Sequence, residues 1–259
     1  MRLLSKLLIP PIFLIFFRFL KRKRFKNISL YNLYDPIFSP WKFTKSKHDL
    51  KNISKYEKFD LLKFEELRNK ILDITLVSND RLWLLYKLSQ NAIVLEGDFV
   101  ECGVYKGGTA LLLSEILRSS RKSKKKLYLF DTFKGMPKTN KQVDNHQMGD
   151  FADTSVDSVF KKIHNPQSII IIDGKLPNSI KKTNIKKISF LHIDLDIYSS
   201  ILETLKILYK KVIPGGIILF DDCGFISCYG ARVAVNEFFS NKKEKPIYLQ
   251  TGQAFIIKR

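Results

Sequence analysis

The chain has 259 residues, 45% of them hydrophobic, which is enough for one α/β domain of ordinary size and an N-terminal extension. Its net charge of +20 favours acidic partners, but no zinc finger, helix-turn-helix or aromatic RNA-binding strand accompanies the lysines, so we expect no specific nucleic-acid binding. Three cysteines without a C-x-x-C pair exclude a disulfide framework and favour a reduced, cytoplasmic protein, and the four histidines show no zinc-type spacing.

The first 26 residues combine an apolar run with eight positive charges. The uncharged run, residues 7–17, is shorter than the roughly 20 residues that a membrane-spanning helix needs, and Pro10 and Pro11 would interrupt a helix. The basic residues 21–24 follow the apolar run, whereas the charges of a secretory signal precede it. This order predicts an anchor at an anionic inner membrane face. The alternative is a segment that packs on its own domain or on a dimer partner.

Residues 27–95 precede the first predicted strand. Residues 27–60 are polar and aromatic, with breakers at Pro36 and Pro40, and predict an irregular arm that covers the active site or mediates dimer contacts. Residues 61–95 predict helices that pack into the core, because apolar residues recur there at helical spacing: Phe64, Leu67, Ile71 and Ile74, then Leu82, Leu85 and Leu88.

From residue 98 onward, strand and helix patterns alternate. The expected strands are residues 98–102, 126–131, 168–173, 187–194 and 216–221. The expected helices are residues 108–120, 153–164 and 199–212. Alternation of this kind indicates a doubly wound, mostly parallel sheet with helices on both faces. Residues 246–250 and 253–258 flank a Thr-Gly turn and predict a terminal β-hairpin.

Carboxylates end two of the predicted strands. Asp194 and Asp196 end the strand 187–194, and Asp221 and Asp222 end the strand 216–221. Neighbouring strands of an α/β sheet bring such ends together, and crowded carboxylates normally need a cation. Oxygen-only ligands favour Mg²⁺ or another hard divalent cation, so Asp194, Asp221 and Asp222 are the candidate metal ligands. Asp196 is either an alternative ligand or the cap of the following helix.

A glycine-bearing turn follows the strand 98–102. Gly103 and Gly107 would let the backbone approach a ligand closely, or would serve only a tight strand-to-helix turn. The next strand ends in Asp131, where nucleoside-binding α/β folds place a ribose-binding carboxylate, although Asp131 could also cap a helix. Asp173 and Gly174 end the strand 168–173 and would contact an adenine edge or form a turn.

Together these segments resemble the macrocin/mycinamicin type of O-methyltransferase. The resemblance covers roughly residues 95–257 and rests on residues 100–108, 130–137, 192–198, 214–222 and 230–235. It implies a seven-stranded, Rossmann-like class I methyltransferase sheet whose C-terminal hairpin supplies the antiparallel strand. It also implies S-adenosylmethionine (SAM) as the cofactor and dependence on a divalent metal.

The resemblance also implies roles for individual residues. Asp194 would be the catalytic base as well as a metal ligand. SAM contacts are expected from residues at the ends of the first three strands: Glu101, Gly103, Tyr105, Gly107, Thr109, Asp131, Thr132, Asp173 and Gly174. Acceptor contacts are expected from His146 and Gln147 in the long loop after the second strand, and from His192. His146 could instead be an exposed loop histidine, and His192 a strand histidine bonded to a backbone carbonyl.

The sequence therefore predicts a SAM-dependent, Mg²⁺-assisted O-methyltransferase that acts on a sugar hydroxyl. The high positive charge favours an acceptor that is lipid-linked or bears phosphate. The expected parts are an anchor at residues 1–26, an arm with helices at 27–95 and the methyltransferase domain at 96–259. The enzyme would be cytoplasmic and peripheral at the inner membrane face, and a homo-oligomer is left open. The alternatives are a catechol-type O-methyltransferase and a non-catalytic, membrane-associated scaffold with the same fold.

Overall fold

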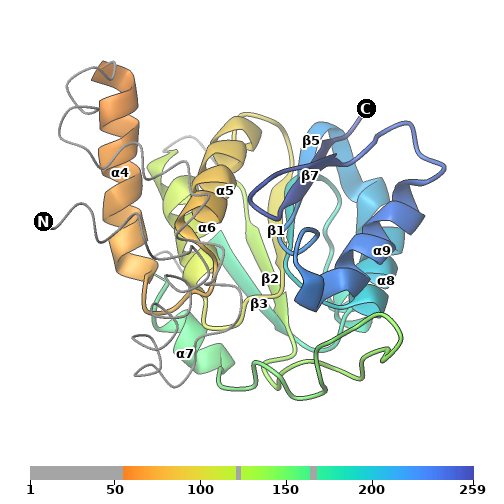
Figure 1. The fold of residues 1–259 in the computed structure, drawn as a ribbon. Helices are drawn as coiled ribbons and strands as arrows, with labels where there is room; N and C mark the ends of the chain where they lie inside the picture. The colour runs from red at the N-terminus through yellow and green to blue at the C-terminus, as the bar shows by residue number, and fades with distance from the viewer. Residues whose placement is uncertain (1–54, 121–123, 164–167) are drawn as a thin grey trace, which may run out of the picture. The chain divides into compact units, whose positions relative to one another are not determined.

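The computed structural model describes residues 55–120, 124–163 and 168–259 (Figure 1). The predicted membrane anchor, residues 1–26, lies outside the described residues. The same holds for residues 27–54, which make up most of the predicted arm. The last part of that arm is not irregular, because a helix already begins at Lys55. No helix in the described parts of the chain is long and apolar enough to cross a membrane.

The centre of the fold is a seven-stranded sheet with the order β3-β2-β1-β4-β5-β7-β6. Its strands are β1 (Asp98–Cys102), β2 (Leu127–Asp131), β3 (Ile169–Asp173), β4 (Ile188–Ile193), β5 (Val212–Phe220), β6 (Ile247–Tyr248) and β7 (Ala254–Ile257). The first five strands pair in parallel, and β7 pairs antiparallel with both β5 and β6. The predicted doubly wound sheet and its C-terminal hairpin are therefore confirmed.

The central strands are apolar along their length because helices cover both faces of the sheet. Phe99 of β1, Phe190 of β4 and Leu219 of β5 are each fully buried. The rings of Phe99 and Phe190 lie 5.3 Å apart between neighbouring strands, a favourable distance for an aromatic pair. Burial of each such side chain contributes about 1.5–3 kcal/mol.

The described part of the chain also holds six α-helices and three short 3₁₀ segments, of which α4 and α5 precede the first strand. The helices are α4 (Lys55–Ile71), α5 (Asn79–Ala92), α6 (Gly108–Ser119), α7 (Val156–Phe160), α8 (Tyr198–Leu208) and α9 (Tyr229–Phe239). The 3₁₀ segments are η5 (Asn178–Lys182), η6 (Tyr209–Lys211) and η7 (Ile226–Cys228). Figure 1 shows α5 and α6 on one side of the sheet and α8 and α9 on the other.

Two helices differ from the sequence-based expectation. The helix expected over residues 153–164 is only α7, which is five residues long. It begins at Val156 rather than at residue 153 because Ser155 forms its capping box, in which Ser155 Oγ accepts from Ser158 N at 3.2 Å. Helix α9 was not predicted, although residues 230–235 within it were used for the family resemblance.

Helices α4 and α5 share one core with the sheet. The predicted apolar stripes lie in this core, where Phe64 and Leu85 are fully buried. The ring of Phe64 packs edge-on against Trp83, with centroids 5.1 Å apart. The hydroxyl of Tyr86 donates to Asp60 at 2.8 Å and so ties α5 to α4. Residues 55–92 therefore form part of the packed body that carries the site.

The sheet reverses its winding between β1 and β4. The chain runs from β1 through α6 to β2 on one side, and from β4 through α8 to β5 on the other. In open α/β sheets, ligands bind beyond the carboxyl ends of the strands at such a switch point. The predicted glycine turn follows β1 and the predicted carboxylates follow β4 and β5, so both lie beside it.

Candidate active site

The turn after β1 needs glycine at residue 103 because the turn packs directly on the backbone of Asp194, the residue that follows β4. Gly103 has φ +90°, and a Cβ atom placed there would come within 1.7 Å of the Asp194 carbonyl oxygen. The Asp194 N–H in turn donates to the Cys102 carbonyl at 2.8 Å. This packing accounts for the glycine at 103 without a ligand. It also fixes the position of Asp194 relative to the predicted cofactor turn.

Asp131 organises that turn from the end of β2. Its Oδ2 accepts from the N–H groups of Val104 at 2.8 Å and Tyr105 at 2.9 Å, and its Oδ1 accepts from Phe133 N–H at 2.8 Å. Asp131 is therefore not the cap of a helix, the alternative considered for it. A carboxylate offers about four acceptor positions, so these bonds leave about one for a ribose hydroxyl.

The other predicted SAM contacts also lie at the carboxyl ends of β1–β3. Gly107 has φ +87° and starts α6, in whose first turn Thr109 is buried. The Thr132 hydroxyl donates to the Gly135 carbonyl at 2.6 Å. Asp173 pairs with Asp131 across β2 and β3. The Gly174 N–H donates to the Asp131 carbonyl at 2.9 Å, so these residues form one continuous edge.

The three predicted metal ligands meet in the structure. One carboxylate oxygen from each of Asp194, Asp221 and Asp222 lies within 4.8 Å of the other two. Asp221 and Asp222 are buried, and Asp194 is partly exposed. Burial and the charges of Asp222 and Asp221 hold the pKa of Asp194 well above its usual range. The pKa of Asp222 is raised in the same direction by burial and by the charges of Asp196 and Asp221.

Arg81, which the sequence analysis missed, supplies part of the opposing charge. Its guanidinium pairs with Asp221 and lies 3.8 Å from Asp222 Oδ1, and the side chain is only 3% exposed. Burial favours protonation of Asp221, but Arg81, His192 and Gln253 together outweigh it and hold the pKa of that carboxyl below its usual value. Arg81 lies four residues before Leu85, so the helical spacing places both on the buried side of α5. A buried arginine needs a carboxylate partner, and this spacing was the signal in the sequence that Arg81 has one.

His192 lies behind the carboxylates. Its Nδ1 is 2.9 Å from Glu101 Oε1 and its Nε2 is 3.8 Å from Asp221 Oδ1. Burial alone would lower the pKa of His192, but the Asp221 and Glu101 carboxylates raise it to about 10. His192 and Glu101 are both fully buried, and the buried Glu101 Oε2 and His192 Nε2 have no hydrogen-bond partner among the described residues. Glu101 holds the His192 ring, and His192 in turn lies beside Asp221. Because Nδ1 of His192 contacts Glu101, it is not bonded to a backbone carbonyl, the alternative considered for this histidine.

The charge of this cluster fits a bound cation. Among the described residues, this cluster holds the five carboxylates Asp194, Asp196, Asp221, Asp222 and Glu101 beside the cationic groups of Arg81 and His192, and His146 lies 3.9 Å from Asp196 Oδ1. The buried Asp222 Oδ2 has no hydrogen-bond partner among the described residues. A buried, unpartnered carboxylate oxygen is costly unless a cation or donor reaches it. The all-oxygen donor set suits a hard divalent ion.

The predicted acceptor residues lie in the loop between β2 and α7. His146 is largely buried, with 12% of its side chain exposed, so it is not an exposed loop histidine. Its neighbour Gln147 is exposed and donates its N–H to Asp150 Oδ2 at 2.9 Å.

Asp196 does not cap helix α8. The N–H of Tyr198, the first residue of α8, donates instead to Asp144 Oδ1 at 2.9 Å. Asp196 has φ +58°, and its Oδ1 lies 3.3 Å from Cys228 Sγ. Burial and the charge of Asp194 raise the pKa of Asp196 to about 7.

Comparison with known proteins places the whole arrangement in one family. A protein of Streptomyces niveus, demethyldecarbamoylnovobiocin O-methyltransferase, is 27% identical over 153 residues, which are 55% of this chain and 58% of that protein. A second, from Streptomyces olivaceus, is 8-demethyl-8-(2,3-dimethoxy-alpha-L-rhamnosyl)-tetracenomycin-C 4'-O-methyltransferase, 22% identical over 153 residues with the same two shares. The chain thus spans a little over half the length of these relatives.

A solved structure and a family model agree with these relatives. The structure of the O-methyltransferase NovP has the same fold, with a TM-score of 0.64 at 23% identity, over 71% of this chain and 82% of that one. The family model for macrocin-O-methyltransferase (TylF) matches residues 38–249. The chain therefore belongs to the macrocin-O-methyltransferase (TylF) family.

Proposed function

We propose that the protein is a SAM-dependent O-methyltransferase that acts on the hydroxyl of a sugar. Family membership and the O-methyltransferase names of the relatives support the reaction class. The rhamnosyl group in the name of the Streptomyces olivaceus relative favours a sugar acceptor over a catechol. The observation that carries the proposal is the carboxylate triad Asp194, Asp221 and Asp222 beside the glycine turn at the switch point of the sheet.

The edge formed by β1–β3 is the proposed SAM site. SAM supplies a methyl group that its sulfonium has already activated, so positioning is the main contribution of the protein. The backbone of residues 103–107 would lie along the methionine part. The remaining acceptor position of Asp131 would take one ribose hydroxyl, and Asp173 and Gly174 would lie near the adenine. Glu101 stays in the proposed site, because His192 uses only its Oε1 and its buried Oε2 has no hydrogen-bond partner among the described residues.

Asp194 is the proposed general base. Of the three carboxylates in the triad, only Asp194 is partly exposed, so it is the one that an acceptor hydroxyl can reach. Its carboxylate would take the hydroxyl proton as the oxygen attacks the methyl group. Asp194, Asp221 and Asp222 would hold a divalent cation such as Mg²⁺, which supplies Lewis acidity toward the hydroxyl when it is bound.

The acceptor side of the site is proposed to be the loop that carries His146 and Gln147. The net charge of +20 favours an acceptor that bears phosphate, such as a nucleotide sugar or a lipid-linked glycan. Residues 1–26 would hold the enzyme at an anionic cytoplasmic membrane surface, where a lipid-linked acceptor is found. Self-association is left to measurement.

Calorimetry with S-adenosylhomocysteine, the demethylated product, separates an enzyme from a non-catalytic scaffold. The full chain should bind the product, and Asp131→Ala should weaken binding by about 1.5–3 kcal/mol, the usual range for a hydrogen bond to a charged group. Asp73→Asn is the matched control, because Asp73 is an exposed aspartate in the turn after α4 and not one of the proposed SAM contacts. No binding by the wild-type chain, with or without Mg²⁺, would favour the scaffold.

A screen of acceptors then tests the substrate class. Nucleotide sugars, lipid-linked glycans and a catechol are each incubated with the enzyme and SAM. Methylation of a sugar hydroxyl is expected, and methylation of the catechol alone would replace the sugar proposal by the catechol-type alternative.

A further inference from the structure

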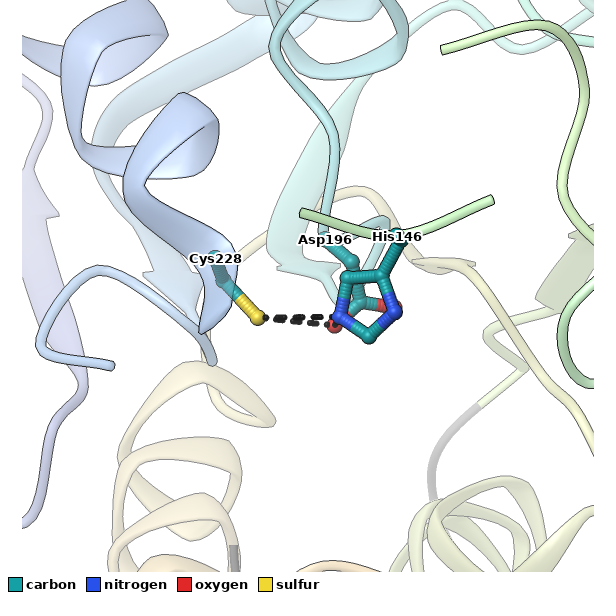
Figure 2. A group of neighbouring side chains, drawn as sticks. All are labelled: His146, Asp196 and Cys228. Carbon is teal, nitrogen blue, oxygen red and sulfur yellow. Dashed lines mark hydrogen bonds and ion pairs between the residues drawn. The ribbon is translucent and has the colours of Figure 1, made fainter. Parts of the chain in front are cut away.

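Three side chains with different metal-binding atoms converge beside the carboxylate triad. His146 comes from the loop between β2 and α7, Asp196 from the turn between β4 and α8, and Cys228 from the end of η7 (Figure 2). Cys228 Sγ lies 3.5 Å from His146 Nε2 and 3.3 Å from Asp196 Oδ1, and His146 Nε2 lies 3.9 Å from that oxygen. A nitrogen, an oxygen and a sulfur from three separate segments therefore face one point.

These distances fit three corners of a tetrahedral zinc site. Zinc binds cysteine sulfur at about 2.3 Å and histidine nitrogen or carboxylate oxygen at about 2.0–2.2 Å, so neighbouring ligand atoms lie about 3.4–3.6 Å apart. The three measured separations, 3.3, 3.5 and 3.9 Å, bracket that value. Small side-chain movements of a few tenths of an ångström would complete the geometry.

Asp150 orients the histidine as a ligand. His146 Nδ1 lies 3.3 Å from Asp150 Oδ2, and because a carboxylate accepts, this contact favours the neutral tautomer that has its proton on Nδ1 and its lone pair on Nε2. Nε2 is the nitrogen that faces Cys228 and Asp196 (Figure 2). A carboxylate on the far nitrogen is the arrangement that commonly fixes metal-binding histidines.

The loop that carries His146 is held against the other two ligands by the residues just before it. Asn145 Nδ2 donates to the Ile226 carbonyl of η7 at 2.8 Å. Asp144 Oδ1 accepts from the N–H of Tyr198 in α8 at 2.9 Å, and Asp144 is only 7% exposed. The loop is thus fixed to both segments that provide Asp196 and Cys228, so the cluster does not depend on a chance loop conformation.

We propose that His146, Asp196 and Cys228 provide three ligands of a binding site for a borderline-soft divalent cation of the Zn²⁺ type. The thiol would release its proton to solvent when the ion binds. A sulfur and an imidazole ligand distinguish this site from the all-oxygen triad of Asp194, Asp221 and Asp222, which suits a hard cation. The ion would tie the loop of residues 144–150 to η7 and α9. The inference stands without the proposed methyl transfer.

Cobalt(II) tests the proposal in the full chain, because thiolate ligation gives Co²⁺ a near-ultraviolet charge-transfer absorption that oxygen-only ligation does not give. The wild-type protein should show this band, excess Zn²⁺ should remove it, and excess Mg²⁺ should leave it. Cys228→Ser should abolish the band. Cys223→Ser is the matched control: Cys223 is an equally buried cysteine five residues away and should leave the band in place.

Two loop variants keep the test decisive if Cys228→Ser does not fold. His146→Gln removes a ligand and should weaken Co²⁺ affinity at least 10-fold, and Asp150→Asn should weaken it about 10–100-fold. Absence of the band in wild type, its survival in folded Cys228→Ser, its loss in folded Cys223→Ser, or unchanged affinity in both loop variants would each overturn the proposal.

Discussion

The pair between Arg81 and Asp221 gives the sharpest stability prediction. Arg81→Met keeps most of the apolar stem but removes the guanidinium that faces Asp221 and Asp222. Both partners are almost completely buried, so the variant leaves a carboxylate without its counter-charge. Breaking a buried pair from one side costs about 3–5 kcal/mol. At about 2–4 °C per kcal/mol for a chain of this size, the melting temperature should fall by about 6–20 °C.

Differential scanning calorimetry, or urea denaturation followed by circular dichroism, measures this loss. Arg118→Met is the control, because Arg118 is also a helical arginine paired with a carboxylate, Glu115, but 58% of its side chain is exposed. An exposed pair of this kind contributes about 0–1 kcal/mol. Mg²⁺ should restore more stability to Arg81→Met than to wild type, because the ion would replace the lost positive charge. Equal losses in the two arginine variants would refute the reasoning.

Three further changes have defined outcomes. Gly103→Ala places a Cβ atom against the Asp194 carbonyl oxygen at a residue with a positive φ. The variant should therefore lower the free energy of unfolding by about 1–3 kcal/mol and weaken Mg²⁺ binding. Calorimetry that shows neither effect would contradict the close packing of Gly103 on Asp194. Burial favours protonation of Glu244, but hydrogen bonds from the Tyr209 hydroxyl and the backbone N–H of Arg259 lower the pKa of Glu244 to about 2. The ionised Glu244 therefore contributes its full stabilisation above about pH 4.5, and this contribution fades as the pH falls toward 2. The stability difference between wild type and Glu244→Gln should therefore be smaller at pH 3 than at pH 5, and urea titrations showing a larger difference at pH 3 would reverse the sign. Deletion of residues 1–26 should abolish binding to vesicles with anionic lipid, which high salt should also weaken; a lower melting temperature with unchanged vesicle binding would indicate packing instead.

The parts of the site that follow strand ends were predictable from the sequence. Asp194 and Asp221 end adjacent parallel strands, so the pattern of apolar runs and acids was enough to bring them to one edge. Gly103 was predictable as part of a tight turn. The physical reason for glycine at residue 103 was not predictable, because the closeness of the Asp194 carbonyl depends on how β1 and β4 align.

The remaining contacts depend on tertiary packing that no local pattern encodes. Arg81 reaches Asp221 across 140 positions of the chain, and its helical stripe indicated only which face was buried. Cys228 and His146 show no metal-type spacing in the sequence, because they meet through two loops fixed by Asp144 and Asn145. The position of Asp131 at a strand end was predictable, but its bonds to the turn require the backbone conformation of Tyr105, whose φ is +49°.

Transfer of a labelled methyl group from SAM tests the central claim most directly. The full chain is incubated with labelled SAM and the sugar acceptors, in Mg²⁺ or in EDTA, beside Asp222→Asn and the control Asp73→Asn. We expect label on a sugar hydroxyl in Mg²⁺, little label in EDTA or with Asp222→Asn, and wild-type transfer with Asp73→Asn. Undiminished transfer in EDTA, or full activity of Asp222→Asn, would contradict the role given to the carboxylate triad, and label on none of the hydroxyl acceptors would contradict the proposed reaction itself.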